Sequence, residues 1–349
     1  MIYRLKTLTI HRNLMTVPQI AVLLALLCFS RSGFSQEEPG EDQQNQYQPS
    51  QYPSDSAEAW LSKMSKAVRS LNYTLSFVVL KPGIDSQPYL WRHGVGDNGI
   101  EMEQLNLLNG PGREVVRIGN KVSYFEPNVP PYSLQSNTLN GPIPSDLLYQ
   151  PEKLFASYQF VLVGRSRVAG RASQQIRVIS KDRSRFGLNL WLDQESGLLL
   201  KMNMVNLEGQ LLEQIQVTGI QVTEQPDPFF SRIEQALLPD ILVIRGQQDS
   251  TARWKFNYLP LGMDVVKQDI HRLPMTGELV DYLLLSDGLV DVSIYLQSLP
   301  GANASQDLIG RHESNTILTR QIGDVSVTVV GKIPPATADA ILKAIQPVQ

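Results

Sequence analysis

The spacing of apolar residues predicts where helix gives way to strand at the start of the folded region. From residue 55 to residue 71, apolar side chains recur at intervals of three and four, the period of one face of a helix. Asp55 and Glu58 stand three residues apart at the start of this stretch, as in a helix capping box. From Tyr73 the interval becomes two, which is typical of a strand with one buried face. We therefore expect an amphipathic helix over residues 55–71, followed by strands.

The strand pattern continues to about residue 223 and predicts a large curved sheet. In residues 113–127, two runs of β-forming residues flank Gly119-Asn120, a dipeptide that suits a tight hairpin turn. Within residues 100–108 the apolar phase shifts by one position, which we interpret as a β-bulge. Further strands are expected at residues 160–168, 174–181, 186–192, 198–205 and 210–223. A sheet of about eight or nine antiparallel strands must curl or close on itself.

Residues 94–99 match the G-x-G-x-x-G spacing of dinucleotide-binding loops, but their surroundings do not suit that function. A dinucleotide loop follows a buried parallel strand and opens a helix, whereas residues 100–105 alternate as a strand does. Asp97 would also place a negative charge beside the pyrophosphate. We interpret this segment as a hairpin turn.

One segment, residues 128–159, interrupts the strands with five prolines, which cannot continue a β ladder. Between and after the prolines lie short apolar groups: Leu147, Leu148, Tyr149, Leu154 and Phe155. We expect these apolar side chains to pack against another apolar surface of the protein. One interpretation is a plug over an ordinary core, and the other is a lid over an apolar cavity that accepts lipid. The pattern alone leaves both open.

Toward the C-terminus the pattern predicts a second, smaller domain. Asp227-Pro228 suits the start of a short helix that ends before Pro239, and the polar composition of residues 240–253 indicates a linker. We therefore expect a first domain at residues 55–239 and a second at residues 254–349. Within the second, strands are expected near residues 278–285, 289–297 and 324–331, with a closing helix at residues 335–345.

The first 54 residues have the features of targeting and leader segments. Basic residues precede an apolar run of about ten residues, and small residues follow near Ser35, which predicts a secretory signal peptide at residues 1–35. Residues 36–54 are rich in Gln, Glu, Pro and Ser, so we expect a disordered leader. Cleavage after Ser35 would remove Cys28, the chain's only cysteine, and with it any disulfide chemistry.

Charge and side-chain chemistry argue against several functional classes. Losing the four basic residues of the signal peptide from the 31 in the chain leaves 27 against 34 acidic ones, a net charge of −7. That balance argues against nonspecific nucleic-acid binding. The remaining histidines, His93, His271 and His312, lack the spacing of H-E-x-x-H, and no G-x-S-x-G motif occurs. We therefore expect neither an enzyme nor a metal or cofactor site.

Eight short motifs occur in the order and spacing of a known family. They are Leu71-Asn72-Tyr73, Arg113-Glu114-Val115-Val116, Ser123-Tyr124-Phe125-Glu126-Pro127, Val163-Gly164-Arg165, Glu213-Gln214, Leu259-Pro260-Leu261-Gly262, Ser286-Asp287-Gly288-Leu289 and Val329-Val330-Gly331-Lys332-Ile333-Pro334-Pro335. Together they resemble the RseB/MucB family, periplasmic regulators of an envelope-stress sigma factor. The resemblance extends over roughly residues 57–346.

The resemblance implies a fold and a function. The implied fold class is α+β with mainly antiparallel strands: an N-terminal half-open β-barrel with helices, similar to lipoprotein carriers, and a smaller C-terminal α+β domain. The implied function is to bind the periplasmic segment of a membrane-bound anti-sigma factor (RseA or MucA) and to shield it from proteolysis. Mislocalised lipopolysaccharide or related lipid would release it. The implied location is the periplasm, and a homo-oligomer is a possible further assembly.

The alternative function is a periplasmic carrier or chaperone of lipid or lipoprotein, because the first domain alone resembles a carrier. The second domain argues against this alternative, since a simple carrier does not need it.

The second domain also carries cations that its strand pattern does not require. In a chain with a net charge of −7, a local basic surface would suit an acidic or phosphate-bearing ligand, although such cations more often solvate sheet edges. Arg311 and His312 are the candidate partner-binding residues, because they are expected in a polar loop that can reach outward.

Overall fold

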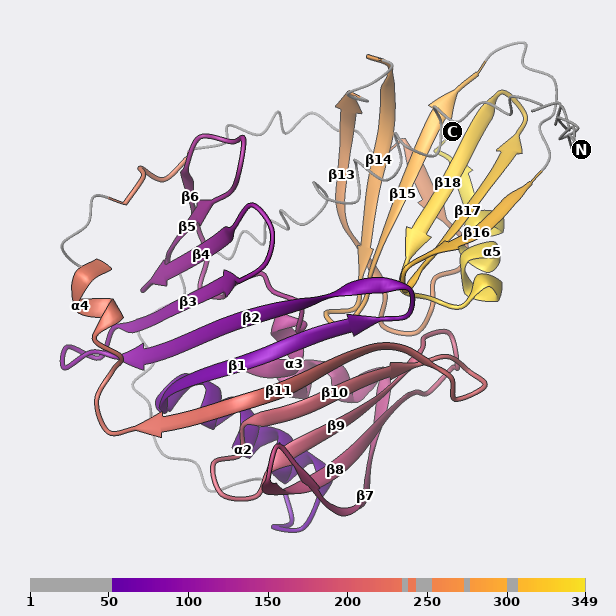
Figure 1. Cartoon of the computed structure of the whole chain (residues 1–349). Coiled ribbons are helices and arrows are strands. Elements are labelled where there is room, and N and C mark those ends of the chain that lie inside the picture. Colours follow the sequence, from indigo (N-terminus) through magenta and orange to yellow (C-terminus); the bar gives the residue numbers. More distant parts are fainter. Residues whose placement is uncertain (1–51, 234–237, 243–252, 273–276, 300–306, 349) are drawn as a thin grey trace, which may run out of the picture.

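The described part of the computed structural model contains a large, a smaller and a two-stranded antiparallel sheet, and the first two meet at a junction (Figure 1). The structure describes residues 52–233, 238–242, 253–272, 277–299 and 307–348. The expected signal peptide, most of the expected leader and most of the expected linker lie outside the described residues.

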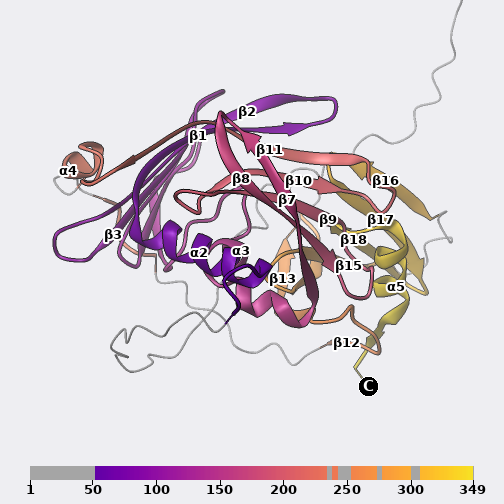
Figure 2. The same ribbon diagram turned by 90° about the horizontal axis from the view of Figure 1, so that it is seen from below.

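Helix α2 (Ala57–Ser70) confirms the amphipathic helix expected from the apolar spacing. Its N-cap is Ser56 rather than Asp55, and the Ser56 hydroxyl accepts a hydrogen bond of 3.0 Å from the backbone N–H of Ala59. The apolar stripe of the helix is buried, because α2 lies in the concave side of the large sheet (Figure 2). The helix therefore supplies one side of the main core.

The large sheet has eleven strands in the order β6-β5-β4-β3-β2-β1-β11-β10-β9-β8-β7. Their bounds are β1 (Asn72–Lys81), β2 (Ile84–Val95), β3 (Glu101–Leu107), β4 (Arg113–Ile118), β5 (Lys121–Phe125), β6 (Tyr132–Gln135), β7 (Tyr158–Val168), β8 (Arg171–Ser180), β9 (Gly187–Asp193), β10 (Leu199–Val205) and β11 (Leu211–Thr223). The sheet curls, but its edge strands β6 and β7 do not pair with each other (Figure 1). This confirms the half-open barrel.

Two predicted turns are confirmed. Strands β4 and β5 form the expected hairpin, with Gly119 at a φ of +59°, in the left-handed region that favours glycine. The G-x-G-x-x-G segment connects β2 to β3 and opens no helix.

The bulge expected within residues 100–108 does not occur in these residues, all of which the structure describes. Strand β3 pairs in unbroken register with both β2 and β4. The apolar phase shifts because the strand is covered on both faces. Met102 packs with Val116 and Phe230, the latter from helix α4 (Phe229–Ile233), whereas Leu105 belongs to the main core.

The proline-rich segment forms two short helical turns on the concave side of the sheet, α3 (Ser145–Tyr149) and the 3₁₀ helix η1 (Pro151–Ala156). Helix α3 packs beside α2 (Figure 2). Together with α2 they cover the apolar side chains that point inward from the strands.

The C-terminal domain is a six-stranded antiparallel sheet in the order β13-β14-β15-β18-β17-β16, with one helix and a two-stranded ribbon. The bounds are β12 (Trp254–Phe256), β13 (Asp264–Arg272), β14 (Leu279–Ser286), β15 (Asp291–Ser298), β16 (Leu308–His312), β17 (Asn315–Ile322), β18 (Val325–Gly331), α5 (Pro335–Ala344) and β19 (Ile345–Pro347). The expected strands correspond to β14, β15 and β18 and the closing helix to α5, whereas β12, β13, β16, β17 and β19 were not predicted. Among the described helices, none is long and apolar enough to span a membrane.

Candidate functional site

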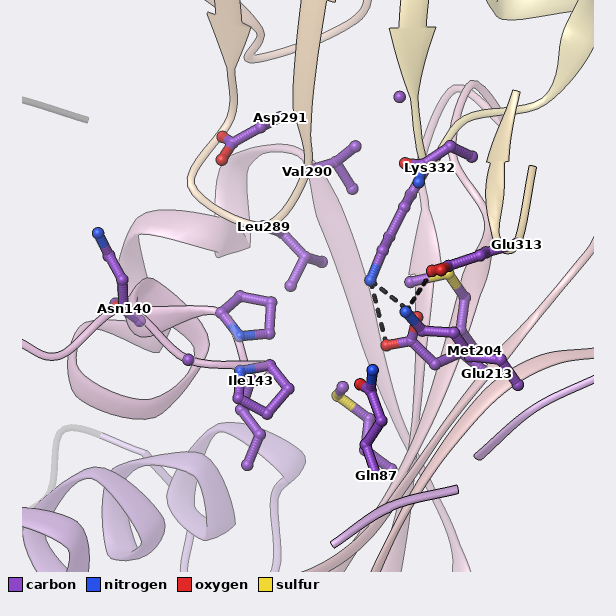
Figure 3. Close-up of a pocket in the computed structure, with 18 of the residues that line it drawn as sticks. Gln87, Asn140, Ile143, Met204, Glu213, Leu289, Val290, Asp291, Glu313 and Lys332 are labelled. Carbon is purple, nitrogen blue, oxygen red and sulfur yellow. Dashed lines mark hydrogen bonds and ion pairs between the residues drawn. The ribbon is translucent and has the colours of Figure 1, made fainter. Parts of the chain in front are cut away.

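A cavity of about 690 Å³ lies at the junction between the two sheets (Figure 3). Its walls come from strands of the large sheet, from residues 140–146 (the loop before α3 and the first residues of that helix) and from the C-terminal domain. The apolar lining residues include Ile143, Leu188, Met202, Met204, Leu289 and Val290. The charged lining residues include Lys81, Arg113, Asp146, Glu213, Asp291, Glu313 and Lys332. This mixture suits a ligand with both apolar and polar parts.

An ion cluster on the cavity wall joins the two domains. We call it the cavity cluster, and it consists of Lys81, Glu213, Glu313, Ser314 and Lys332. The carboxylate of Glu213, on β11, accepts hydrogen bonds from Lys332 Nζ at 2.9 Å and from the Ser314 hydroxyl at 3.0 Å. Lys81, at the end of β1, pairs with Glu313 in the β16–β17 turn. Each domain thus contributes one cation and one anion.

The cavity cluster also sets the ionisation of Glu213. This side chain is almost fully buried, and burial disfavours its charged form. Lys332, Lys81 and the Ser314 hydroxyl outweigh that effect and hold the pKa of Glu213 below its ordinary value. Glu213 is therefore a carboxylate at neutral pH.

A second ion cluster, which we call the buried cluster, consists of Tyr158, Asp182, Arg185 and Asp287. Arg185 and Asp287 come from different domains, and both side chains are fully buried. Arg185 Nε donates to Asp287 at 2.9 Å, and the Tyr158 hydroxyl donates to the same carboxylate at 2.6 Å. Burial and the Asp287 charge raise the pKa of Tyr158, so its phenol stays protonated and can donate. Asp182 pairs with Arg185 at 3.1 Å.

Two glycines let the domains approach this closely. A Cβ at Gly288 would lie 2.3 Å from a carboxylate oxygen of Asp146, and one at Gly262 would lie 1.9 Å from the Ser157 hydroxyl. Both glycines also have positive φ, +83° and +74°, which other residues rarely adopt. A side chain at either position would displace the side chain of Asp146 or Ser157 from the junction.

Four motifs that the sequence shares with the RseB/MucB family meet at this junction. They supply Glu213, the backbone of Leu261 and Gly262, Asp287 with Gly288, and Lys332. Periodicity alone did not single out these charged residues, because Asp287 and Lys332 lie just outside the strands and Glu213 lies among the apolar residues of β11. The motifs were the only sequence signal that could have located them.

The five apolar residues proposed as a lid or plug do not line the cavity. Leu147, Leu148, Tyr149 and Leu154 are buried in the main core, and Phe155 is partly buried against it. This is the packing of a plug. The residues just before them, 140–146, are the part of the segment that reaches the cavity (Figure 3).

A buried polar group fixes the plug to the sheet. The Tyr149 hydroxyl donates to Glu103 Oε1 at 2.6 Å, and Arg117 Nε donates to the other oxygen of that carboxylate at 2.6 Å. Glu103 is fully buried and Arg117 almost so. Burial and the Glu103 charge raise the pKa of Tyr149, which keeps its hydroxyl a donor.

Arg311 and His312 lie on edge strand β16 and not in the loop expected from the sequence. An edge strand exposed on both faces shows no apolar alternation, so its sequence looks like a polar loop. The Arg311 guanidinium lies 5.7 Å from the ring centre of Phe186, across the domain junction. His312 lines the cavity, with Nε2 3.9 Å from the Glu313 carboxylate.

The chemistry of this site is that of binding. Two ion pairs on its wall, Lys81–Glu313 and Glu213–Lys332, join the domains, and apolar side chains form much of the remaining wall. Within the described part of the chain, no group of three or more His, Cys, Asp or Glu side chains is placed to hold a metal ion.

Comparisons with known proteins match both domains. The MucB/RseB N-terminal domain family covers residues 56–241, and the MucB/RseB C-terminal domain family covers residues 248–346. The sigma-E factor regulatory protein RseB of Escherichia coli K12 is 32% identical over 290 residues, which is 82% of this chain and 90% of that protein. The sigma factor AlgU regulatory protein MucB of Pseudomonas aeruginosa is 29% identical over 298 residues, 83% of this chain and 91% of that protein.

Solved structures agree. A complex of Pseudomonas aeruginosa MucA and MucB matches 84% of this chain and 99% of the solved chain, with 26% identity and a TM-score of 0.68. MucB in complex with MucA(peri) matches with 28% identity and a TM-score of 0.67, and MucB alone with 26% identity and a TM-score of 0.55. Each covers 84% of this chain, and 100% and 98% of the solved chains, respectively. The chain therefore belongs to the MucB/RseB family.

Proposed function

We propose that this periplasmic protein binds the periplasmic segment of a membrane-bound anti-sigma factor and shields it from proteolysis. It would thereby act as a negative regulator of an extracytoplasmic-function sigma factor. The observation that carries this proposal is the likeness, over both domains, to MucB bound to MucA. The regulatory names of RseB and MucB support it.

The relative position of the two domains is the feature that the partner would stabilise. The chain matches the two MucA complexes with TM-scores of 0.68 and 0.67, but MucB alone with 0.55. The arrangement described here, with both ion clusters formed, is thus more similar to the partner-bound relatives. A partner that contacts both domains would favour this arrangement by its difference in affinity for the two states.

Lipid is proposed as the release signal, and the junction cavity is proposed as its site. About 690 Å³ is within the usual size of small-molecule pockets, about 300–1,000 Å³. Each buried methylene contributes about 0.8 kcal/mol, so an acyl chain of about 12 carbons has a gross gain near 10 kcal/mol before ordering costs. Leu188, Met202 and Met204 form the apolar wall against which such a chain would pack. A lipid in this cavity would contact both domains.

A second candidate function is a carrier of lipid or lipoprotein, which the apolar wall of the cavity also favours. Two observations support regulation over carriage. The cavity is completed by the C-terminal domain, and ion pairs on its wall tie that domain to the barrel. A carrier would need only the barrel.

A protease-protection assay tests the proposal. The purified periplasmic segment of the cognate anti-sigma factor is digested with and without an equimolar amount of this protein, and then with lipopolysaccharide added. We expect slow digestion with the protein present and fast digestion once lipopolysaccharide is added. Equal digestion rates with and without the protein would refute the proposal.

A matched pair of variants distinguishes the loss of lipid binding at the cavity from the effect of adding a positive charge elsewhere on the protein. Met204→Lys places a charge on the apolar wall, whereas Leu207→Lys places the same charge at a position that is 56% exposed and outside the cavity lining. We expect Met204→Lys to protect the segment but to need more lipopolysaccharide for release, and Leu207→Lys to match the wild type. The same lipid requirement for both variants would place the lipid elsewhere.

A further inference from the structure

The free edges of the two sheets differ in how they are protected against pairing with another chain. The two larger sheets each have two edge strands, β6 and β7 in the eleven-stranded sheet and β13 and β16 in the six-stranded one. A free edge presents unpaired N–H and C=O groups, so proteins protect it with charges, bulges or a covering segment. An edge without such protection is a candidate docking strand.

Three of the four edges are protected. Strand β6 is covered by a following segment, where Ser133 bridges Ile241 and the N–H of Leu242 donates to the Ser133 carbonyl at 2.8 Å. Strand β7 has a register shift and two exposed arginines, Arg165 and Arg167. Strand β13 also has a register shift, and its exposed side chains include Asp264, Asp269 and Arg272.

Strand β16 has the fewest of these devices: its exposed charge is Arg311, near its C-terminal end, and no described segment covers its free edge. It pairs with β17 in unbroken register, and no described strand pairs with its other edge. Its first residues are Leu308 and Ile309, which are apolar and 48% and 59% exposed, followed by Gly310. Burial of side chains this exposed would favour association.

The hairpin geometry shows which backbone groups point outward. Strands β16 and β17 are joined by two residues, so the closing pair, His312 and Asn315, is hydrogen-bonded across the hairpin. Because the bonding alternates along an antiparallel pair, Ile309 and Arg311 direct their N–H and C=O groups toward the free edge. Two such residues are enough to seat a short extended segment.

The end of β16 leads into the junction cavity. His312, Glu313 and Asn315 line it, and Glu313 adopts a φ of +54°, an uncommon value for a residue other than glycine. Its carboxylate pairs with Lys81 of the barrel, which holds this turn against the N-terminal domain. A chain paired with β16 would therefore lie next to the cavity and could contact both domains.

We propose that β16 is the docking strand for the anti-sigma factor: an extended, apolar segment of that partner pairs with its free edge, with one end at the junction cavity. This inference rests on the proposed function and names the surface that would perform it. An apolar partner segment is chosen because the exposed side chains beside the free groups, Leu308 and Ile309, are apolar. The cavity at the end of the strand explains how one short segment would contact both domains.

Binding of the purified periplasmic domain of the cognate anti-sigma factor, measured by titration calorimetry, tests the docking strand. Ile309→Pro removes an outward N–H while sparing the bonds to β17, and edge strands accept proline at such positions. Ile309→Lys adds a charge where the partner's apolar side chains would lie. We expect each variant to weaken binding by about ten-fold or more. Ile270→Lys, on the protected edge strand β13 and also exposed, is the matched control and should bind as the wild type does.

A second measurement modifies the peptide backbone of the partner and leaves this protein unchanged, so its result does not depend on the folding of a variant. The wild-type protein is titrated with synthetic peptides of the partner segment, N-methylated at alternate residues in one register or the other. Strand pairing predicts that one register loses binding and the other keeps it. Suppose that the N-methylated peptides of both registers bind as the unmethylated peptide does, and that both Ile309 variants bind the partner as the wild type does. Then β16 is not the docking strand.

Two other outcomes are distinguishable. If the wild type itself does not bind the anti-sigma domain, the proposed function fails, and the docking strand fails with it. If the Ile309 variants change only the mass of the protein in size-exclusion chromatography and leave partner binding intact, the edge serves a second copy of this chain and the proposal is overturned.

Discussion

Replacing Asp287 with Asn would test whether the buried cluster holds the two domains together. In the folded protein the Asp287 carboxylate is fully buried and pairs with Arg185, also fully buried, at 2.8 Å. It accepts the Tyr158 hydroxyl with one oxygen and the N–H groups of Leu289 and Val290 with the other. Asn keeps the size of the side chain but removes the charge, and it directs an N–H₂ group toward donors.

The expected cost follows from leaving a buried cation with too little compensation. Removing one partner of a buried pair typically costs about 3–5 kcal/mol. Asp182 still pairs with Arg185 at 3.1 Å, but it is partly exposed and also accepts the Leu261 N–H. We therefore expect Asp287→Asn to lower the free energy of unfolding by about 3 kcal/mol, the lower end of that range.

Urea denaturation followed by tryptophan fluorescence measures this cost. Because Arg185 and Asp287 belong to different domains, we also expect the variant to unfold in two steps as the domains uncouple. Asp324→Asn, in an exposed turn, is the control and should change stability by no more than about 0.5 kcal/mol. A loss below about 1 kcal/mol in Asp287→Asn, with a single transition, would refute the view that this pair couples the domains.

Three further predictions concern the core, the cavity cluster and the junction. Leu147→Ala should cost about 2–5 kcal/mol of unfolding free energy, because this side chain is fully buried in the plug; a near-neutral result, with lipid uptake lost, would mean that the segment is a lid. The pKa of Glu213 is depressed in the folded protein, so its contribution to stability is complete above the ordinary value, about 4.3, and is lost as the pH falls below it. Glu213→Gln should remove that part of the acid destabilisation in denaturation curves between pH 3 and 7, and an unchanged profile would contradict the assignment. Arg311→Glu should weaken anti-sigma binding, more at low salt than at high salt because reversal of a charge is screened least there, and equal affinities at both salts would remove Arg311 from the interface.

Local sequence patterns determined the elements and much of the fold class. The interval of three and four residues located α2, and Gly119-Asn120 located the β4–β5 hairpin, because these signals depend only on neighbouring residues. The length of the alternating region predicted a sheet that must curl, which the eleven-stranded half-open barrel confirms. The polar composition of residues 240–253 and the apolar pattern that follows then predicted a second domain.

Where local patterns failed, the cause was packing from a distance. The phase shift in β3 comes from α4, which covers the outer face of a strand more than a hundred residues earlier in the chain. Strand β16 resembled a loop because it has solvent on both faces. A strand's period tells which of its faces is buried but not what buries it.

The candidate site could only be decided by the tertiary structure. Its two ion clusters join residues that lie 119 and 102 positions apart, Glu213 with Lys332 and Arg185 with Asp287. Neither pair has a spacing that sequence could reveal, since side chains so distant meet only when both sheets are folded and docked. The motifs included Glu213, Asp287 and Lys332 but not Arg185, and they did not indicate which residues are in contact. Their pairing, the depressed pKa of Glu213 and the cavity between them all depend on burial at the junction, which is a property of two folded domains in contact.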